Sequence, residues 1–248
     1  MNDPVPVILR LDEIDSTNCY GQDNFTDLAD GTLIVADCQT AGRGRRGRAW
    51  ISPSKQNIYA SYIVKRPIEP IWNAARILSL AALNVIDLFA PELECSIKWP
   101  NDLYCNGKKL AGILCESHIG PNNRPDGAIL GLGININMPQ ETLEKISHPA
   151  TSLLVECNHE FVVEKFVNAL AISLNQCYIN YFQSDDGLFA SWKERNFLLG
   201  KNVDVIDEKD VVRTGIVLDL APDGALIVDF GNGPEQLLCG DVSVRNRA

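Results

Sequence analysis

The chain has 248 residues, of which 46% are hydrophobic, and its formal net charge at pH 7 is −10. A chain of this length and hydrophobic content can bury the core of one larger domain and of a small second domain. The acidic balance argues against a broad nucleic-acid or membrane-binding face, because such faces carry an excess of basic residues. We therefore expect a globular protein with neither DNA nor a membrane among its partners.

Neither a targeting signal nor a metal site is expected. No N-terminal segment joins basic residues, an apolar stretch and a cleavage site, and we expect no apolar run to span a bilayer. The eight cysteines lack C-x-x-C pairs and only three histidines accompany them. This predicts reduced, mostly buried thiols and no fixed protein metal site. The predicted compartment is the cytoplasm, where thiols stay reduced.

Hydrophobic periodicity predicts strands and helices in turn along most of the chain. Apolar residues at three- and four-residue steps indicate a buried helix, and the Asn106-Gly107 pair favours a hairpin because it suits a type I′ turn. In chain order we expect a strand at 5–13, a short helix from Ser16 toward Gln22, strands at 32–38 and 57–64, the helix at 70–90, the hairpin at 103–115, a strand at 127–137 and helices at 161–182 and 188–196.

The pattern changes after Gly200. Short strands are expected at 203–206, 211–220, 225–230, 236–239 and 242–244, separated by turns rich in aspartate, glycine and proline. The spacing predicts a small all-β domain at 199–248, of the five-stranded SH3-like barrel type, after a larger domain at 1–198.

The most informative segment is the arginine loop, Gly42-Arg43-Gly44-Arg45-Arg46-Gly47-Arg48. Its glycines allow a close backbone approach to a ligand, and its four guanidinium groups match carboxylate or phosphate oxygens. The spacing G-x-G-x-x-G is that of a dinucleotide-binding turn, but a strand rather than a helix follows, and no Gly-Lys-Ser/Thr closes the segment as in a P-loop. We therefore predict a site for a small anion, with a solvated basic turn as the alternative.

Two further motifs are candidates for ligand contact, one through polar side chains and the other through backbone without side chains. In Lys98-Trp99-Pro100-Asn101-Asp102 the proline ends a strand and stiffens the turn. In Gly131-Leu132-Gly133-Ile134-Asn135 two glycines alternate onto one sheet face, which predicts close packing of a backbone, a helix or a flat ligand. The period of two also places Lys109 on one face with Ala111 and Ile113, either as a charged edge residue or as a placed cation.

These motifs, in this order, resemble those of the biotin protein ligases (biotin–[acetyl-CoA-carboxylase] ligases). The resemblance extends over essentially the whole chain, because it also covers Asp15-Ser16-Thr17-Asn18, Gln39, Trp50, the segment Gly107-Lys108-Lys109-Leu110-Ala111-Gly112-Ile113-Leu114 and the end Val242-Ser243-Val244-Arg245. It implies an α+β fold with a mixed β-sheet flanked by helices and the small barrel at the C-terminus. It also implies an enzyme that joins biotin to ATP, giving biotinyl-5′-AMP and pyrophosphate, and then transfers biotin to one lysine of a biotin carboxyl carrier protein.

The resemblance further implies roles for individual residues. Biotin is expected to contact Ser16, Thr17, Asn18, Gln39, Arg43, Gly44, Arg45, Lys109, Gly112 and Gly131. ATP and the adenylate are expected to contact Arg46, Arg48, Trp50, Lys98, Asn101, Gly133, Asn135 and Arg245. The implied catalytic residues are Lys109, which contacts both the biotin carboxylate and the α-phosphate, Arg45, which retains the adenylate, and Asp102, which orients the incoming lysine or Mg²⁺.

Other readings stay open at this point. A lipoate or octanoate ligase of the related fold is the nearest, and a nucleic-acid-binding module or an adapter built on the barrel are the non-enzyme alternatives. Relatives that double as repressors carry an N-terminal winged helix-turn-helix, which we expect to be absent because fifteen residues precede Ser16. Exposed sheet edges would allow a homodimer, or pairing with the carrier by strand addition.

Overall fold

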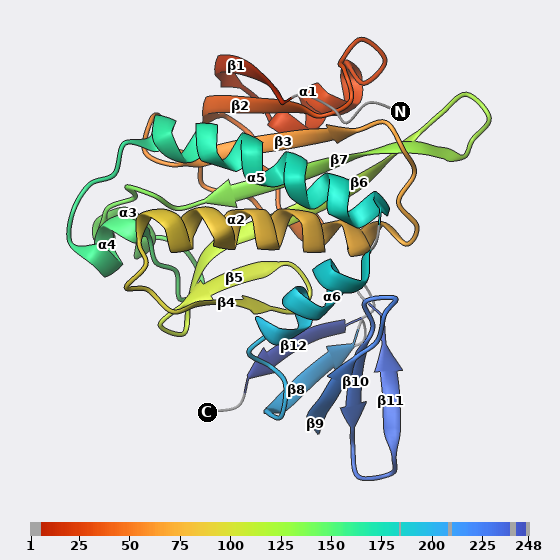
Figure 1. The fold of residues 1–248 in the computed structure, drawn as a ribbon. Helices are drawn as coiled ribbons and strands as arrows, with labels where there is room; N and C mark the ends of the chain where they lie inside the picture. Colours follow the sequence, from red (N-terminus) through yellow and green to blue (C-terminus); the bar gives the residue numbers. More distant parts are fainter. Residues whose placement is uncertain (1–5, 184, 208–209, 239–241, 247–248) are drawn as a thin grey trace.

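Two β-sheets and the helices around them organise the chain (Figure 1). The structure, a computed structural model, describes residues 6–183, 185–207, 210–238 and 242–246. The larger sheet has seven strands in the order β1-β2-β3-β7-β6-β5-β4, and the smaller sheet has five in the order β11-β10-β9-β8-β12. The α+β fold class and the small all-β part at the C-terminal end are thereby confirmed.

Within the described residues, the larger part of the chain contains seven strands, six α-helices and two short 3₁₀ turns. In chain order they are β1 (Val7–Ile14), α1 (Thr17–Asp23), β2 (Thr32–Gln39), the 3₁₀ turn Arg45–Gly47, β3 (Ile58–Val64), the 3₁₀ turn Ile71–Ala74, α2 (Ala75–Phe89), β4 (Cys95–Lys98), β5 (Asp102–Cys105), β6 (Lys108–Ile119), β7 (Pro125–Ile134), α3 (Gln140–Leu143), α4 (Leu153–Cys157), α5 (Val163–Gln183) and α6 (Asp185–Glu194). The smaller sheet contains β8 (Asn202–Asp207), β9 (Val212–Leu220), β10 (Leu226–Asp229), β11 (Pro234–Leu237) and β12 (Val242–Asn246).

The larger sheet is mixed because β1 and β2 pair in parallel, whereas its other neighbouring strands pair in antiparallel fashion. Parallel neighbours need a crossover connection, and α1 provides it. The β5–β6 hairpin turns at Asn106 (φ +48°) and Gly107 (φ +74°), the left-handed pair that a type I′ turn requires. The hairpin is therefore as predicted.

Helices α2 and α5 cover one face of the larger sheet (Figure 1). Side chains alternate between faces along a strand, so that Tyr62 of β3 packs in the main core beneath these helices and Ile63 points to the other side. There Ile63 and Ile129 form a smaller core with Phe25, over which α1 packs. Helix α1 covers only part of this second face, which we call the open face.

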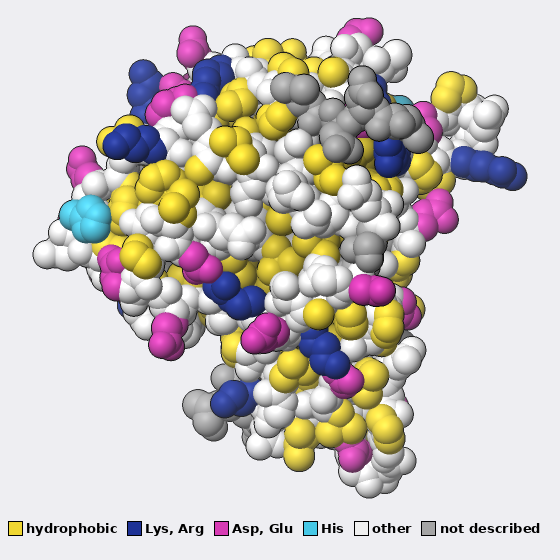
Figure 2. Space-filling model, in the orientation of Figure 1, with side chains coloured by type: hydrophobic (Ala, Val, Ile, Leu, Met, Phe, Trp, Pro, Cys, Tyr) yellow, Lys and Arg dark blue, Asp and Glu magenta, His cyan; other side chains and the backbone are white. Residues whose placement is uncertain are grey.

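The helix-covered face carries no concentration of charge. Figure 2 shows basic and acidic side chains interspersed there, with hydrophobic side chains between them. Within the described ranges, one segment, Ile71–Phe89, has the length and hydropathy to cross a membrane, and 72% of its most apolar window is buried inside the fold. We expected no such segment from the sequence. Its apolar character reflects contacts with the sheet on one side and with α5 and α6 on the other.

The ends of several elements differ from those predicted. The expected helix at 70–90 divides into the 3₁₀ turn Ile71–Ala74 and α2. Helices α3 and α4 were not predicted, because four or five residues are too few to show a helical period. The five expected C-terminal strands are present, and those the structure pairs are antiparallel. The expected end of the fourth, at residue 239, lies outside the described residues.

The smaller sheet docks on the larger part through the turn between β9 and β10. Trp72 Nε1 donates to the carbonyl of Asp223 at 3.0 Å, and Trp99 Nε1 donates to that of Gly224 at 2.9 Å. Arg76 donates to the carbonyl of Pro222. The contact therefore combines directed hydrogen bonds with apolar packing, because buried residues of the smaller sheet such as Val217 and Leu220 belong to the same hydrophobic core as the larger part.

The packing of α2 gives a direct test of this core. Leu78 is fully buried, and Leu78→Ala should lower the free energy of unfolding by about 2–5 kcal/mol, because it removes apolar contacts and leaves a cavity. Leu88, on the same helix, is 66% exposed, and Leu88→Ala should cost less than about 0.5 kcal/mol. Urea unfolding of the two variants measures both values. Equal costs would contradict the placement of α2.

Candidate active site

A cavity of about 1000 Å³ lies on the open face of the larger sheet. All but one of the residues predicted at the site line it: Ser16, Thr17, Asn18, Gln39, Arg43, Gly44, Arg45, Arg46, Arg48, Trp50, Lys98, Asn101, Asp102, Lys109, Gly112, Gly131, Gly133 and Asn135. The exception is Arg245, whose backbone pairs with Asp204 in the smaller sheet and whose side chain lies outside the described part of the chain. Residues spread over much of the sequence thus meet around one cavity.

Three glycines form the floor of the cavity. Strands β6 and β7 pair Gly112 with Gly133, and Gly131 lies two residues from Gly133 on the same face. A Cβ at Gly131 would lie 2.2 Å from Oδ1 of Asn18, and a Cβ at Gly133 would lie 2.4 Å from the indole of Trp50. Both distances are far below van der Waals contact. The predicted shared face is confirmed. The floor has no side chains of its own, and α1 and Trp50 therefore lie directly on it.

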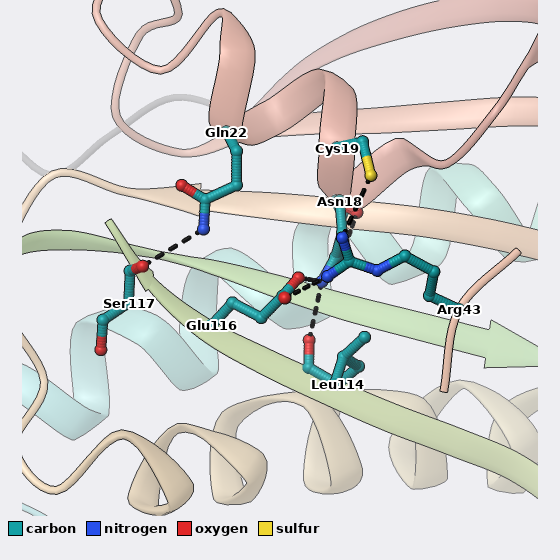
Figure 3. A network of polar contacts seen from close by, with 8 residues as sticks. Asn18, Cys19, Gln22, Arg43, Leu114, Glu116 and Ser117 are labelled. Atoms are coloured by element: carbon teal, nitrogen blue, oxygen red, sulfur yellow. Dashed lines mark hydrogen bonds and ion pairs between the residues drawn. The ribbon is translucent and has the colours of Figure 1, made fainter. Parts of the chain in front are cut away.

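Hydroxyl and amide groups fill one end of the cavity. The backbone N–H and the hydroxyl of Thr17 donate to Oε1 of Gln39 at 2.9 and 3.2 Å. Ser61 Oγ lies 2.8 Å from Oγ1 of Thr17 and 2.6 Å from Oδ1 of Asn18. Asn18 Nδ2 in turn donates to Oε2 of Glu116 at 2.7 Å (Figure 3). The network holds donors and acceptors in fixed positions, and we call it the amide end.

The arginine loop is fastened to both ends of the cavity. Arg43 forms an ion pair with Glu116 and lies 3.2 Å from the sulfur of Cys19, which ties the loop to β6 and α1 (Figure 3). Arg45 Nη1 donates to Oδ1 of Asn101 at 3.0 Å, in the turn between β4 and β5. Arg46 has a φ of +57°, so the backbone bends back on itself between these two anchors. The loop therefore lines one side of the cavity, although Arg43, Arg46 and Arg48 are also exposed to solvent.

Lys109 reaches the cavity floor because of a bulge in β6. Leu103 pairs with Ala111 and Tyr104 pairs with Lys109, so Leu110 has no partner on β5 and forms a bulge. The bulge moves the side chain of Lys109 to the sheet face opposite to the one that a regular strand would give it. A Cβ at Gly112 would lie 3.2 Å from Cε of Lys109, so these two residues share a face. The predicted placement of Lys109 with Ala111 and Ile113 is wrong, because a regular period of two does not anticipate the bulge.

The side chain of Lys109 also forms an ion pair with Asp102. Its Nζ lies 2.6 Å from Oδ1 of Asp102 and 5.5 Å from the centre of the Trp50 ring. Its backbone N–H donates to the carbonyl of Pro149 at 3.0 Å, and its carbonyl accepts from Thr151 at 2.9 Å. The neighbouring Lys108 is exposed, as predicted.

The lining is strongly positive in an acidic protein. It contains seven lysine and arginine side chains, Arg43, Arg45, Arg46, Arg48, Lys98, Lys109 and Lys145, whereas Asp102 is its only carboxylate among the described residues. The chain as a whole has 32 acidic and 22 basic residues. Fixed cations around a partly enclosed cavity favour an anionic ligand, because the surrounding protein screens them less than water does.

Neighbouring charges also shift the pKa values of groups at the cavity. Desolvation, together with cations such as Lys109, lowers the pKa of His148, which favours its neutral form. Partial burial, with a contribution from the charge of Asp102, raises the pKa of Tyr104 to about 12, so its hydroxyl stays protonated beside Lys98 at 3.3 Å. Neither His148 nor Tyr104 was predicted from the sequence.

Further cavity residues were missed as well. Segment 145–150 forms one wall, and Ser61 and Glu116 support the amide end. Sequence periodicity gives no signal for segment 145–150, because the segment is placed by the pairing of Ala150 with Lys109, 41 positions earlier in the chain. The described residues contain no group of three or more His, Cys, Asp or Glu side chains that could hold a metal ion.

Comparison with known proteins agrees with the resemblance. The biotin/lipoate A/B protein ligase family matches residues 10–135, and the biotin protein ligase C-terminal domain matches residues 198–245. The biotin–[acetyl-CoA-carboxylase] ligase of Mycobacterium tuberculosis is 33% identical over 246 residues, which cover 94% of this chain and 88% of that protein.

Two other similarities extend along most of the chain. The bifunctional ligase/repressor BirA of Bacillus subtilis is 29% identical over 219 residues, or 87% of this chain and 66% of that protein. The structure of the Aquifex aeolicus biotin protein ligase in complex with biotin and ATP has a TM-score of 0.83 and 26% identity, and the match covers 97% of this chain and 99% of that one. The chain therefore belongs to the biotin/lipoate A/B protein ligase family and, within it, to the biotin protein ligases.

Proposed function

We propose that this protein activates biotin with ATP and transfers it to a lysine of a carrier protein. The observation that carries the proposal is the cavity itself, in which seven cationic side chains and one carboxylate surround a floor of three glycines. In the first step a biotin carboxylate oxygen attacks the α-phosphorus of ATP, forming biotinyl-5′-AMP and releasing pyrophosphate. In the second step the amine of the carrier lysine attacks the acyl carbon, which forms an amide and releases AMP.

The first step brings two anions together, and the cations offset this repulsion. A carboxylate and a triphosphate repel each other, so positive groups fixed before the reaction lower its barrier. Lys109 is the residue best placed for this role, because its side chain lies on the cavity floor at Gly112 and beside Asp102. We assign it contacts to the biotin carboxylate and to the α-phosphate.

The amide end suits the head of biotin. The ureido ring of biotin has two N–H donors and one carbonyl acceptor, and Ser16, Thr17, Asn18 and Gln39 offer hydroxyl and amide partners there. The bare backbone at Gly131 and Gly112 lets Asn18, Trp50 and Lys109 approach the sheet closely, and the cavity that they line would hold a flat, largely apolar ligand body. This arrangement supports the biotin contacts assigned to these residues, and to Arg43 and Gly44 above them.

The remaining cations and amides serve the nucleotide. Lys98, Asn101 and Asn135 line the cavity together with Trp50, Gly133, Arg46 and Arg48, and we assign them to the nucleotide. We also assign Arg245 to the nucleotide. The arginine loop, fastened through Arg45 to Asn101, excludes water from the adenylate, a mixed anhydride that water would hydrolyse.

Mg²⁺ fits this site only together with ATP. Magnesium in nucleotide enzymes is held by one or two carboxylates and by the phosphates of the substrate, and Asp102 is the carboxylate available in the described lining. When bound, the ion would neutralise phosphate charge. Asp102, paired with Lys109 at 2.6 Å, keeps the lysine on the cavity floor before the ion arrives.

Several finer assignments belong to the same proposal. Residues 1–198 form the catalytic domain and residues 199–248 the C-terminal domain, and a biotin carboxyl carrier protein is the acceptor. The seven cysteines within the described residues are all free thiols, three of them buried, which supports a cytoplasmic location. Exposed sheet edges support pairing with the carrier or with a second copy, which sedimentation would detect.

The function is tested by incubating a carrier domain with the protein, ATP and either biotin or lipoate, followed by mass spectrometry. We expect one biotinyl group on one lysine, and none without ATP. A lipoyl group in place of biotin would assign the protein to the lipoate ligases of the same family. No modification with either acid would contradict the proposed function.

Lys109→Ala should reduce the rate of pyrophosphate release by at least about 100-fold, because it removes a fixed charge at the reacting groups. Some biotin affinity should remain, since the amide end is intact. Lys108→Ala is the matched control, because Lys108 is the exposed neighbour of Lys109, and its rate should stay within about twofold of the unaltered protein. Equal rates for the two variants would remove Lys109 from the mechanism.

Arg45→Gly should release biotinyl-5′-AMP into solution. The substitution removes the hydrogen bond at 3.0 Å between the arginine loop and Asn101, so the loop no longer closes over the adenylate. The free adenylate would acylate exposed lysines of unrelated proteins. Biotin blotting of a mixture of bystander proteins measures this, and labelling no wider than that of the unaltered protein would contradict the role of Arg45.

A further inference from the structure

Three consecutive backbone carbonyls of the smaller sheet are bound by three side chains of the larger part. They belong to Pro222, Asp223 and Gly224, which we call the docking turn. Arg76 Nη2 donates to the first carbonyl, Trp72 Nε1 to the second at 3.0 Å, and Trp99 Nε1 to the third at 2.9 Å. One side-chain donor for each carbonyl fixes the docking turn in both position and orientation.

The docking turn fits its surroundings closely. Gly224 has a φ of +84°, and a Cβ there would lie 2.6 Å from Oδ1 of Asn73, so both conformation and space require glycine. Arg76 is 1% exposed and Trp99 is 2% exposed. Arg76 also donates to Asn73 at 3.0 Å and lies over the ring of Trp192. Buried donors of this kind are costly to leave unmatched, so the contact is held firmly.

One of the three donors belongs to the active-site motif. Trp99 stands between Lys98 and the Asn101-Asp102 pair, in the turn that joins β4 and β5. Asn101 holds Arg45 of the arginine loop at 3.0 Å and donates to the backbone of β6 at 2.6 Å. A displacement of Trp99 would therefore move the groups that we assign to the nucleotide.

Among the described residues, no hydrogen bond joins the amide end to the smaller sheet. Within the described part of the chain, the hydrogen bonds of Thr17, Asn18 and Gln39 run to one another, to β3, to β6 and to the loop after β2. All of these belong to the larger part of the chain. Loss of the hydrogen bond between Trp99 and the docking turn should accordingly affect the two ends of the cavity unequally.

We propose that the docking turn, acting through Trp99, is a positioning element that sets the nucleotide side of the cavity. The proposal rests on the function proposed above and assigns to Trp99 a role in ATP use rather than in biotin binding. Trp99 acts through Lys98, Asn101 and Asp102 and takes no direct part in the reaction. The smaller sheet is then part of the catalytic apparatus even where it does not touch a substrate.

The test compares Trp99→Phe with Trp72→Phe in the full-length protein. Each substitution removes one indole N–H from the docking turn, but Trp72 does not line the cavity and does not adjoin its motif. Trp99→Phe should lower kcat/KM for ATP in pyrophosphate release at least about tenfold, since small misplacements of reacting groups are costly. Biotin affinity, measured by calorimetry, should stay within about twofold for both variants, and Trp72→Phe should retain most of its kcat/KM for ATP.

The outcomes separate the two proposals. An unaltered protein that binds biotin but releases no pyrophosphate would contradict the proposed function. An active protein whose Trp99→Phe and Trp72→Phe variants lose equal kcat/KM for ATP, or whose Trp99→Phe variant loses biotin affinity in parallel, would overturn the positioning role. If Trp99→Phe does not fold, Gly224→Ala decides, because it displaces the same carbonyl from the other side. The same selective loss of ATP use is expected from it, and unaltered ATP use would overturn the proposal.

Discussion

The bare backbone of β6 and β7 on the open face is the constraint on which the rest of the cavity depends. Because Gly131 and Gly133 have no side chains, Asn18 and the indole of Trp50 lie directly on the sheet, at distances a Cβ would forbid. As a consequence, α1 supplies part of the amide end, and the indole of Trp50 packs on the floor at Gly133. A side chain at either glycine would displace the groups that define the two ends of the site.

Charge is arranged around this floor in a way that the overall composition conceals. The chain is acidic, yet its cavity gathers seven lysine and arginine side chains against one carboxylate in the described residues. Such a concentration of like charge is destabilising unless an anion joins it, and it is held by Glu116, Asn101 and Asp102. These cations repel one another in the folded protein, and they would stabilise a carboxylate and a triphosphate that react with each other.

Much of this arrangement could be predicted from the sequence, because it depends on local pattern. The shared face of Gly131 and Gly133 follows from the period of a strand, and the Asn106-Gly107 turn follows from its preferred dihedral angles. The position of Lys109 does not, since the bulge at Leu110 is set by pairing with β5. The docking turn could not be predicted from the sequence, because its hydrogen bonds are accepted by backbone carbonyls, which every residue has.

The central claim is that the cavity activates a carboxylate by adenylation, and isotope exchange between pyrophosphate and ATP tests it most directly. The exchange requires the adenylate to form and revert within the site, and it needs no carrier protein. We expect exchange that depends on biotin and that lipoate does not support. Absence of exchange with biotin, in protein shown to be folded and to bind biotin, would contradict it.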